Sequence, residues 1–149
     1  MNLLINRATT VDLPALNQIA WTAKQHWNYP EQWMESWRDE LQLNEKDLDS
    51  HCVFKLSINK EVKGFCAVKE HSNSYEVCHL WVLPECMGRG YGKLLLHLTM
   101  YYAVKANKPI QVIADPNAKA FYQRQGFQVV DQFESYPKGR FLPIMTYVR

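Results

Sequence analysis

The sequence lacks the features that mark several large classes of protein. No apolar run approaches the ~20 residues that a membrane-spanning helix needs, and no basic-then-apolar leader opens the chain. Basic residues form no stripe or run, and the formal net charge is only +2, so nucleic acid is not an expected partner. We therefore expect a cytoplasmic protein that binds neither a membrane nor nucleic acid.

Spacings typical of metal sites and disulfide frameworks are also missing. Cys52, Cys66, Cys78 and Cys86 show no C-x-x-C pattern, and the five histidines form no cluster. Three of these cysteines fall in expected strands, so buried, reduced thiols are the expected state. We predict no metal site.

What remains is the composition of an ordinary globular protein. Of the 149 residues, 47% are hydrophobic and 21% are charged, which is enough apolar material for a packed core. No internal repeat, linker or low-complexity tract divides the chain. We therefore expect a single domain over residues 1–149.

Glycine is scarce except in one short stretch. Of the six glycines, Gly88, Gly90 and Gly92 occupy alternate positions. The apolar run Val77–Leu83 precedes them and leucines at helical spacing follow, which predicts a strand, a glycine loop and a helix. In that geometry the first N–H groups of the helix and the loop amides point at one place, where an anion can sit. Glycine suits such a loop because a side chain would block a phosphate, or because φ must be positive.

Spacing decides which phosphate-binding loop this could be. A Walker loop requires G-x-x-x-x-G-K-[ST], but Leu94 follows Lys93 and position 87 is methionine. The dinucleotide fingerprint G-x-G-x-x-G is not met either. Arg89 and Lys93 add positive charge beside the glycines, so we interpret the stretch as a pyrophosphate cradle. A glycine-rich turn without a ligand is the alternative.

Periodicity along the rest of the chain predicts a mixed α/β protein. The first helix is expected to be capped by Thr10 or Thr9 and to run to Trp27. Further helices are expected from Pro30 through Trp33, Trp37 and Leu41, after the glycine loop, and from Asp115 to Gly126. The strands expected from the same patterns are Leu3–Asn6, Cys52–Ile58, Val62–Val68, Tyr75–Leu83, Ile110–Ala114, Phe127–Phe133 and Arg140–Val148. The predicted order is therefore β-α-α-β-β-β-α-β-α-β-β.

Two motifs and this order resemble the GNAT superfamily of N-acetyltransferases. After Val82-Leu83-Pro84, the run Met87-Gly-Arg-Gly-Tyr-Gly92 resembles the family's acyl-CoA loop [QR]-x-x-G-x-[GA], although Met87 replaces the usual Gln or Arg. Residues 117–127 resemble its N-x-x-A-x-x-F-Y-x-x-x-G-F region, with alanines flanking the usual alanine position. Residues 139–143 resemble the tail of a bacterial subset, so the resemblance covers nearly the whole chain. It implies an α/β (α+β) fold with a largely antiparallel sheet of about seven strands and helices on both faces.

The resemblance also implies acetyl-CoA as co-substrate. The cofactor would contact the glycine loop, the backbone of the preceding strand and the later helix: Leu80, Trp81, Val82, Met87, Gly88, Arg89, Gly90, Tyr91, Gly92, Lys93, Asn117 and Tyr122. The backbone N–H of Met87 is expected to keep donating, and Asn117 would contact the pantetheine arm, cap its helix, or both. Tyr122 would be the general acid that protonates the departing sulfur. Without the resemblance, Tyr122 is equally well explained as core.

An N-acetyltransferase must also deprotonate its acceptor. A lysine-like amine has a pKa of ~10.4, so near pH 7 a general base is needed. Glu76 falls where the histone-acetylating branch of the family carries its strand glutamate, and the resemblance makes it the candidate base. His79 is a rival with a better intrinsic pKa. On a regular strand the two side chains face opposite ways, so only one would reach the cleft unless a bulge intervenes.

The family shapes its acceptor pocket from the first two helices and the last hairpin. This implies acceptor contacts from Trp27, Tyr29, Trp33 and Arg140, with Trp37 and Tyr136 as further candidates. Aromatic walls favour an apolar or cationic acceptor, although tryptophans at helical spacing are more often core. The expected function is direct acetyl transfer to a primary amine of a small molecule. A CoA-binding sensor without catalysis and a protein-amine acetyltransferase are the alternatives. Homodimers are common among such enzymes, which leaves the oligomeric state open.

Overall fold

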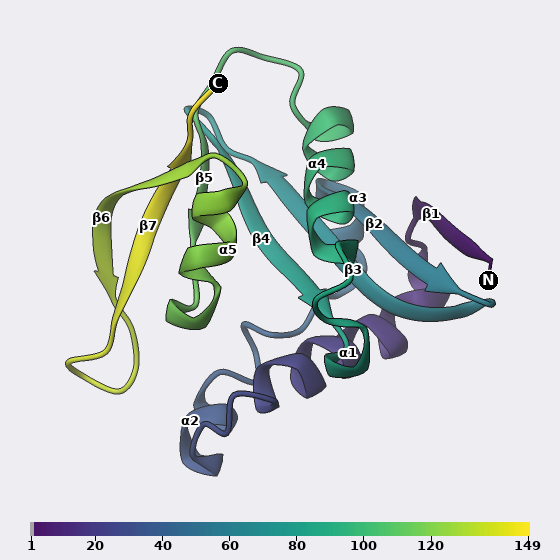
Figure 1. The fold of residues 1–149 in the computed structure, drawn as a ribbon, viewed down its shortest axis with the longest axis horizontal. Coiled ribbons are helices and arrows are strands. Elements are labelled where there is room, and N and C mark those ends of the chain that lie inside the picture. The colour runs from purple at the N-terminus through teal and green to yellow at the C-terminus, as the bar shows by residue number, and fades with distance from the viewer. Residues whose placement is uncertain (1) are drawn as a thin grey trace.

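A seven-stranded sheet runs through the computed structural model, which describes residues 2–149 (Figure 1). Its strands are β1 Leu3–Arg7, β2 His51–Ile58, β3 Glu61–Glu70, β4 Tyr75–Val82, β5 Ile110–Ile113, β6 Phe127–Glu134 and β7 Phe141–Tyr147. They lie in the order β1-β2-β3-β4-β5-β7-β6. All neighbours are antiparallel except β4 and β5, which are parallel. The expected mixed, largely antiparallel sheet is confirmed.

Helices cover both faces of this sheet. They are α1 Leu13–Gln25, α2 Glu31–Ser36, α3 Glu45–Ser50, α4 Tyr91–Ala103 and α5 Lys119–Arg124. On one face, Leu95 of α4 and Tyr122 of α5 share a buried core with Val68. On the other face, Leu16 of α1 is buried with Phe65. Within residues 2–149, no helix is both long and apolar enough to cross a bilayer.

The first two helices are shorter than the sequence predicts. The helix expected from Pro30 to Leu41 ends at Ser36, and residues 37–41 form turns. The Ser36 hydroxyl donates to the Trp33 carbonyl at 2.6 Å, and such a bond competes with the regular helical pattern. Helix α1 ends at Gln25, so Trp27 lies beyond the helix and is 41% exposed instead of lying on its apolar face.

Helix α3 was not expected from the sequence. Asn44 and Asp47 form a reciprocal capping box, in which each side chain accepts the other residue's backbone N–H at 2.9 Å. The six-residue helix has no buried residue, so it has no apolar periodicity to reveal it. The capping pair was the signal available in the sequence.

Two turns that the sequence predicts are present. Asn59 and Lys60, between β2 and β3, have φ values of 52° and 72°, as a tight hairpin turn of the primed type requires. Gly126 follows α5 with φ of 101°, which is a helix C-cap conformation suited to glycine. An added Cβ at Gly126 would also lie 3.1 Å from the Tyr147 ring.

The parallel strands β4 and β5 separate soon after they begin. They pair only at Tyr75–Ile110 and Glu76–Gln111, whereas β4 stays paired with β3 as far as Val82. Figure 1 shows the two strands moving apart from that point. Along the second half of β4, the backbone groups on the β5 side have no strand partner within the described residues. Backbone N–H and C=O groups need hydrogen-bond partners when they are removed from water. The unpaired groups of β4 at this splay are therefore available to a ligand.

Candidate active site

The glycine loop lies between β4 and α4. Gly88 and Gly90 have φ values of 77° and 83°, and an added Cβ at either position would have no atom within 4 Å. Their requirement for glycine is therefore conformational, since other residues rarely adopt this region. Gly92 does not have a positive φ, and its added Cβ would meet the Phe121 ring at 3.5 Å. Two of the three loop glycines are needed for backbone conformation.

The conformation of this loop leaves several backbone N–H groups without hydrogen-bond partners. The N–H groups of Gly88, Arg89 and Gly90 have no hydrogen-bond partner within the described residues. The N–H groups of Gly92 and Lys93, in the first turn of α4, have no backbone acceptor within the described residues either. The N–H of Met87 instead donates to the carbonyl of Pro84 at 3.2 Å, so it is not the free donor expected from the sequence. From Gly88 onward, the loop therefore presents free N–H donors of the kind that bind anions.

A groove of about 520 Å³ extends from this loop along β4. It is lined by almost all of the residues expected at the cofactor: Leu80, Trp81, Val82, Met87, Gly88, Gly90, Tyr91, Gly92, Lys93, Asn117 and Tyr122. The remaining one, Arg89, is not among the lining residues. Arg124 also lines the groove and adds a second cation beside Lys93. The groove is long, positively lined and rich in free amides, which suits an extended ligand that ends in phosphates.

An inner cavity of about 160 Å³ adjoins this groove between the diverging strands. The two spaces share Leu80, Trp81 and Tyr122. On its other side, the cavity shares Val77, Cys78 and His79 with an open cleft of about 1050 Å³. These three spaces lead from the glycine loop, across the splay, to a second opening. A ligand in the groove would meet a second molecule entering from the cleft.

Tyr122 lies where the groove meets the inner cavity. Its ring is 5% exposed and packs edge-on against Phe121 and Phe127, with centroids 5.2 and 5.3 Å away. The hydroxyl forms no hydrogen bond with residues 2–149 and is not fully enclosed, since every fully buried side-chain polar atom in this range has a partner. Burial raises the pKa of Tyr122 far above its usual range, so the group stays protonated. The Tyr122 side chain therefore presents a protonated hydroxyl to the spaces that it lines.

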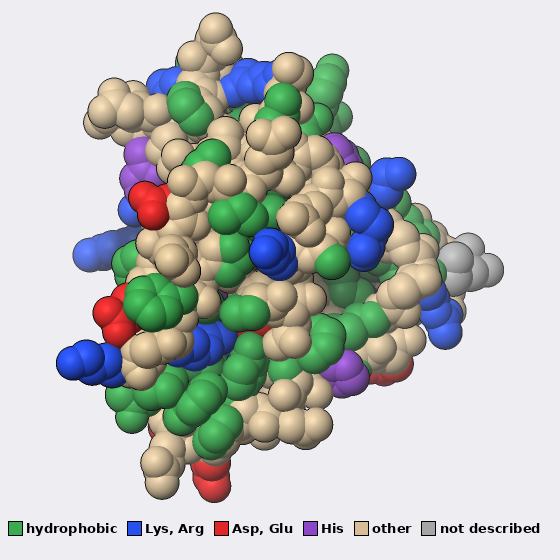
Figure 2. Space-filling model, turned by 60° about the vertical axis from the view of Figure 1, so that its left-hand side comes forward, with side chains coloured by type: hydrophobic (Ala, Val, Ile, Leu, Met, Phe, Trp, Pro, Cys, Tyr) green, Lys and Arg blue, Asp and Glu red, His purple; other side chains and the backbone are tan. Residues whose placement is uncertain are grey.

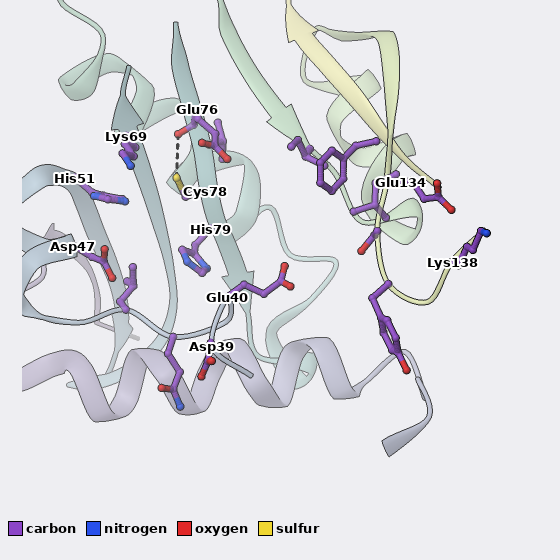
Figure 3. A pocket seen from close by; sticks show the side chains of 18 residues that line it. Asp39, Glu40, Asp47, His51, Lys69, Glu76, Cys78, His79, Glu134 and Lys138 are labelled. Atoms are coloured by element: carbon purple, nitrogen blue, oxygen red, sulfur yellow. Dashed lines mark hydrogen bonds between the residues drawn. The ribbon is translucent and has the colours of Figure 1, made fainter. Parts of the chain in front are cut away.

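A β-bulge in β4 brings both candidate bases to the open cleft. Ala67 pairs with His79 but Val68 pairs with Val77, so Cys78 has no partner on β3. The extra residue breaks the regular alternation, and Glu76 and His79 both line the cleft (Figure 3). On a regular strand only one of these two side chains would reach the cleft, and the bulge is the reason that both do.

The two candidate bases lie in different surroundings. His79 is 8% exposed, and its Nδ1 accepts a hydrogen bond from Trp81 Nε1 at 3.0 Å. Burial lowers the pKa of His79 to about 4, so the ring is neutral near pH 7 and weakly basic. The Glu76 side chain is 35% exposed, with Oε1 2.8 Å from Nε2 of His71. Glu76 is therefore the carboxylate that water can reach.

A buried polar network centred on Asp115 closes the inner cavity. Lys24 Nζ lies 2.5 Å from Asp115 Oδ2, the Tyr29 hydroxyl donates at 3.0 Å, and Arg140 Nη2 lies 3.5 Å away. Asp115 also accepts the Asn117 backbone N–H, so Asp115 is the cap at this position and Asn117 is not. The Asn117 amide donates instead to Tyr29 and Asp115. The network joins α1, the α1–α2 bend, the end of β5 and the last hairpin.

Two cations share the single carboxylate of this network. Burial raises the pKa of Asp115, but the charge and hydrogen bond of Lys24 outweigh it and hold that pKa below its usual range. Burial lowers the pKa of Lys24, and Asp115 does not fully compensate because Arg140 adds a second positive charge. Both cations lie over the Trp37 ring, 4.7 and 4.5 Å from its centroid. The sequence interpretation missed Lys24, although a lysine one turn after the buried Ala20 requires a partner.

The residues that the sequence predicts at the acceptor do not all line the same space. Trp37 and Arg140 line the inner cavity, and Tyr29 holds Asp115 beside it. Trp33 packs against Tyr29 and Trp37, with ring centroids 5.9 and 6.0 Å away, and lines none of the three spaces. Trp27 lines the cofactor groove instead of the acceptor side. Arg140 is engaged with Asp115 and Tyr29, so it is not a free partner for an acceptor carboxylate.

The aromatic end of the molecule forms one wall of the acceptor side. Figure 2 shows hydrophobic side chains gathered at the lower end of one face, where α2 lies in Figure 1. Trp37 Nε1 donates to the Tyr136 carbonyl at 3.2 Å, which ties the segment after α2 to the last hairpin. Tyr136 itself lines the open cleft. Helix and hairpin together therefore bound the space through which an acceptor would enter.

The cysteines supply no alternative chemistry at the splay. All four are free, and no group of three or more metal-binding side chains lies together within residues 2–149. Burial raises the pKa of both Cys66 and Cys78 to about 12. Cys78, which lines the inner cavity, is therefore held as a thiol and is a poor nucleophile near pH 7.

A phosphate-binding groove that meets a second cleft across splayed parallel strands is the arrangement of an acyltransferase that uses a nucleotide-bearing thioester. Comparison with known proteins identifies the family. Residues 49–129 match the family model described as an acetyltransferase (GNAT) domain, which is more than half of the chain. The chain belongs to the GNAT superfamily and is an acetyl-CoA-dependent acyltransferase.

One curated relative and many solved structures are similar to the chain. The uncharacterized N-acetyltransferase YafP of Escherichia coli K12 is 33% identical over 119 residues, which cover 78% of this chain and 72% of that protein. PaiA N-acetyltransferase of Thermoplasma acidophilum, solved with coenzyme A, has a TM-score of 0.79 at 21% identity, with 99% of each chain covered. The ribosomal-protein-S18-alanine N-acetyltransferase of E. coli has a TM-score of 0.68 at 19% identity and covers 98% and 93%. At these identities the structures show the shared fold.

Proposed function

We propose that this chain transfers the acetyl group of acetyl-CoA directly to a primary amine of a small molecule. The observation that carries the proposal is the junction of groove, inner cavity and cleft at the splay, where Tyr122 lines both the groove and the inner cavity. The diphosphate would lie on the amides from Gly88 onward, and the pantetheine arm along Leu80–Val82. Direct attack is favoured over a covalent intermediate because Cys78 is held protonated.

The reaction needs two proton transfers, one from the acceptor amine and one to the leaving sulfur, and a different residue would carry out each. The acceptor arrives protonated, and removing its proton near pH 7 costs about 4–5 kcal/mol, so the base matters most. Glu76 lines the open cleft but not the inner cavity, and it would therefore take the proton through a water molecule. Tyr122 would give its proton to the leaving sulfur. His79 is the weaker candidate base because its pKa is about 4.

The proposal is tested by following free thiol released from acetyl-CoA over a panel of primary amines. We expect thiol release and N-acetylated product in equal amounts, detected by a thiol reagent and by mass spectrometry. Thermal stabilisation by coenzyme A without turnover of any amine would favour a sensor instead. Turnover of lysine or N-terminal peptides but of no small amine would favour a protein acceptor.

Glu76→Gln is expected to lower kcat/KM by roughly 10²-fold near pH 7 and to remove one inflection from the pH profile. A carboxylate base works only when it is deprotonated, so activity of the unchanged protein should fall at acid pH. The glutamine variant has no such step, and its rate follows only deprotonation of the acceptor. Glu70→Gln is the matched control, since Glu70 pairs with Lys108 outside the cleft. A low-pH inflection that persists in Glu76→Gln would assign the base to another group.

A further inference from the structure

The open cleft carries negative charge although the chain as a whole is positive. Five carboxylates line the cleft against the two lysines Lys69 and Lys138; they are Asp39, Glu40, Asp47, Glu76 and Glu134. Burial lowers the pKa of the two lining histidines, His51 and His79, so both are neutral near pH 7. Five acids against two lysines leave three negative charges, whereas the chain has a formal net charge of +2.

These cleft carboxylates are left without cationic partners from the protein. Elsewhere carboxylates are paired, as in Asp12 with Lys55 at 2.8 Å and Glu70 with Lys108 at 2.6 Å. Within residues 2–149, none of the five forms an ion pair with Lys or Arg, and Glu76 contacts only His71. Figure 3 shows Glu40 between the β4 wall and the hairpin, while Lys138 lies on the hairpin loop at the outer edge. Their charge is available to a ligand.

The inner end of the same space carries no net charge. Lys24 and Arg140 line the inner cavity together with Asp115 and Glu40, so two cations face two carboxylates there. Tyr122 lines this inner end, and its hydroxyl forms no hydrogen bond with the described residues, so it can donate to a ligand. Burial in a small cavity without net negative charge favours the neutral, nucleophilic form of an incoming amine. Negative charge further out favours a cation there.

We propose that the acceptor is an aliphatic diamine or polyamine, which rests on the acetyl transfer proposed above. One nitrogen enters the inner cavity as the neutral nucleophile, and a second, protonated nitrogen is held by the carboxylates of the cleft. The nucleophile forms the N–C bond to the thioester carbonyl, and the C–S bond breaks. The amine proton passes through water to Glu76, and the sulfur takes a proton from Tyr122. A monoamine lacks the second cation that the cleft carboxylates would hold. An amino acid would place its own carboxylate beside them, where the like charges repel.

The test compares kcat/KM for three acceptors of equal length, cadaverine, pentylamine and aminovalerate, with acetyl-CoA held constant. We expect cadaverine to exceed pentylamine by at least about fivefold, as a few exposed charge pairs can supply, and aminovalerate to be slowest. The preference for cadaverine should shrink in about 0.5 M salt, because exposed charges are screened. Equal turnover of all three would overturn the diamine inference and leave acetyl transfer standing. No turnover of any amine would overturn both.

A pair of double variants tests whether the cleft charges cause the preference. Asp39→Asn with Glu40→Gln should lower kcat/KM for cadaverine at least about fivefold more than for pentylamine. Glu45→Gln with Asp49→Asn removes the same charge from exposed positions of α3 that do not line the cleft, and it should keep the wild-type ratio. A change of equal size in both doubles would contradict a local effect. Faster turnover of a lysine-rich peptide than of cadaverine would also overturn the inference, in favour of a protein acceptor.

Discussion

Gly90→Val is expected to abolish coenzyme A binding while the protein remains folded. Gly90 caps α4 in the left-handed region with φ of 83°, which a β-branched residue adopts only with strain. An added Cβ would have no atom within 4 Å, so the core is not disturbed. The valine side chain would instead stand in the groove that Gly90 lines, and the strained loop would turn its amides away from the diphosphate.

Isothermal titration with coenzyme A and a thermal melt measure this result. Gly139→Val is the matched control, because Gly139 has φ of 90°, also has open space around its Cβ position, and lies in the β6–β7 loop away from the groove. Both variants should lose a similar amount of stability, of order 1–2 kcal/mol. Only Gly90→Val should lose binding. Wild-type affinity in Gly90→Val would place the diphosphate elsewhere.

Local patterns were enough to predict much of the fold and the cofactor side of the site. The strand, glycine loop and helix around Gly88 and Gly90 follow from residues adjacent in sequence, because turn conformation and helix starts are set locally. The Asn59–Lys60 hairpin was predictable for the same reason. Helix α3 shows the limit of periodicity, since a six-residue helix with no buried face leaves only a capping pair to detect it.

Features that depend on distant partners could not be predicted. Lys24 and Asp115 are 91 residues apart, and nothing in the sequence joins them. The bulge at Cys78 depends on how β3 and β4 pair, and a strand pattern alone assumes regular alternation. That single extra residue puts Glu76 and His79 on the same cleft. The acceptor side was therefore harder to predict than the cofactor side, because it is assembled from α1, α2, β4 and the last hairpin.

Tyr122→Phe is expected to lower kcat by about 10²–10⁴-fold with little change in coenzyme A affinity. The change removes only the hydroxyl, which makes no hydrogen bond within the described residues, so the ring still packs against Phe121 and Phe127. The melting temperature should accordingly stay the same or rise slightly, since no buried partner is left unpaired. Catalysis should fall because the leaving sulfur loses its proton donor.

The pH–rate profile and a control substitution at a second tyrosine test whether Tyr122 acts in catalysis or only in packing. Burial raises the pKa of Tyr122, so the donor stays protonated through the alkaline range and should not itself cause an alkaline loss of activity. Tyr101→Phe is the control, because Tyr101 is 78% exposed and lines none of the three spaces of the site. Equal kcat for Tyr122→Phe and the unchanged protein would make Tyr122 a packing residue between two phenylalanines. The sulfur would then leave as the thiolate, which a leaving group with a pKa near ~8.5 can do at a modest cost in rate.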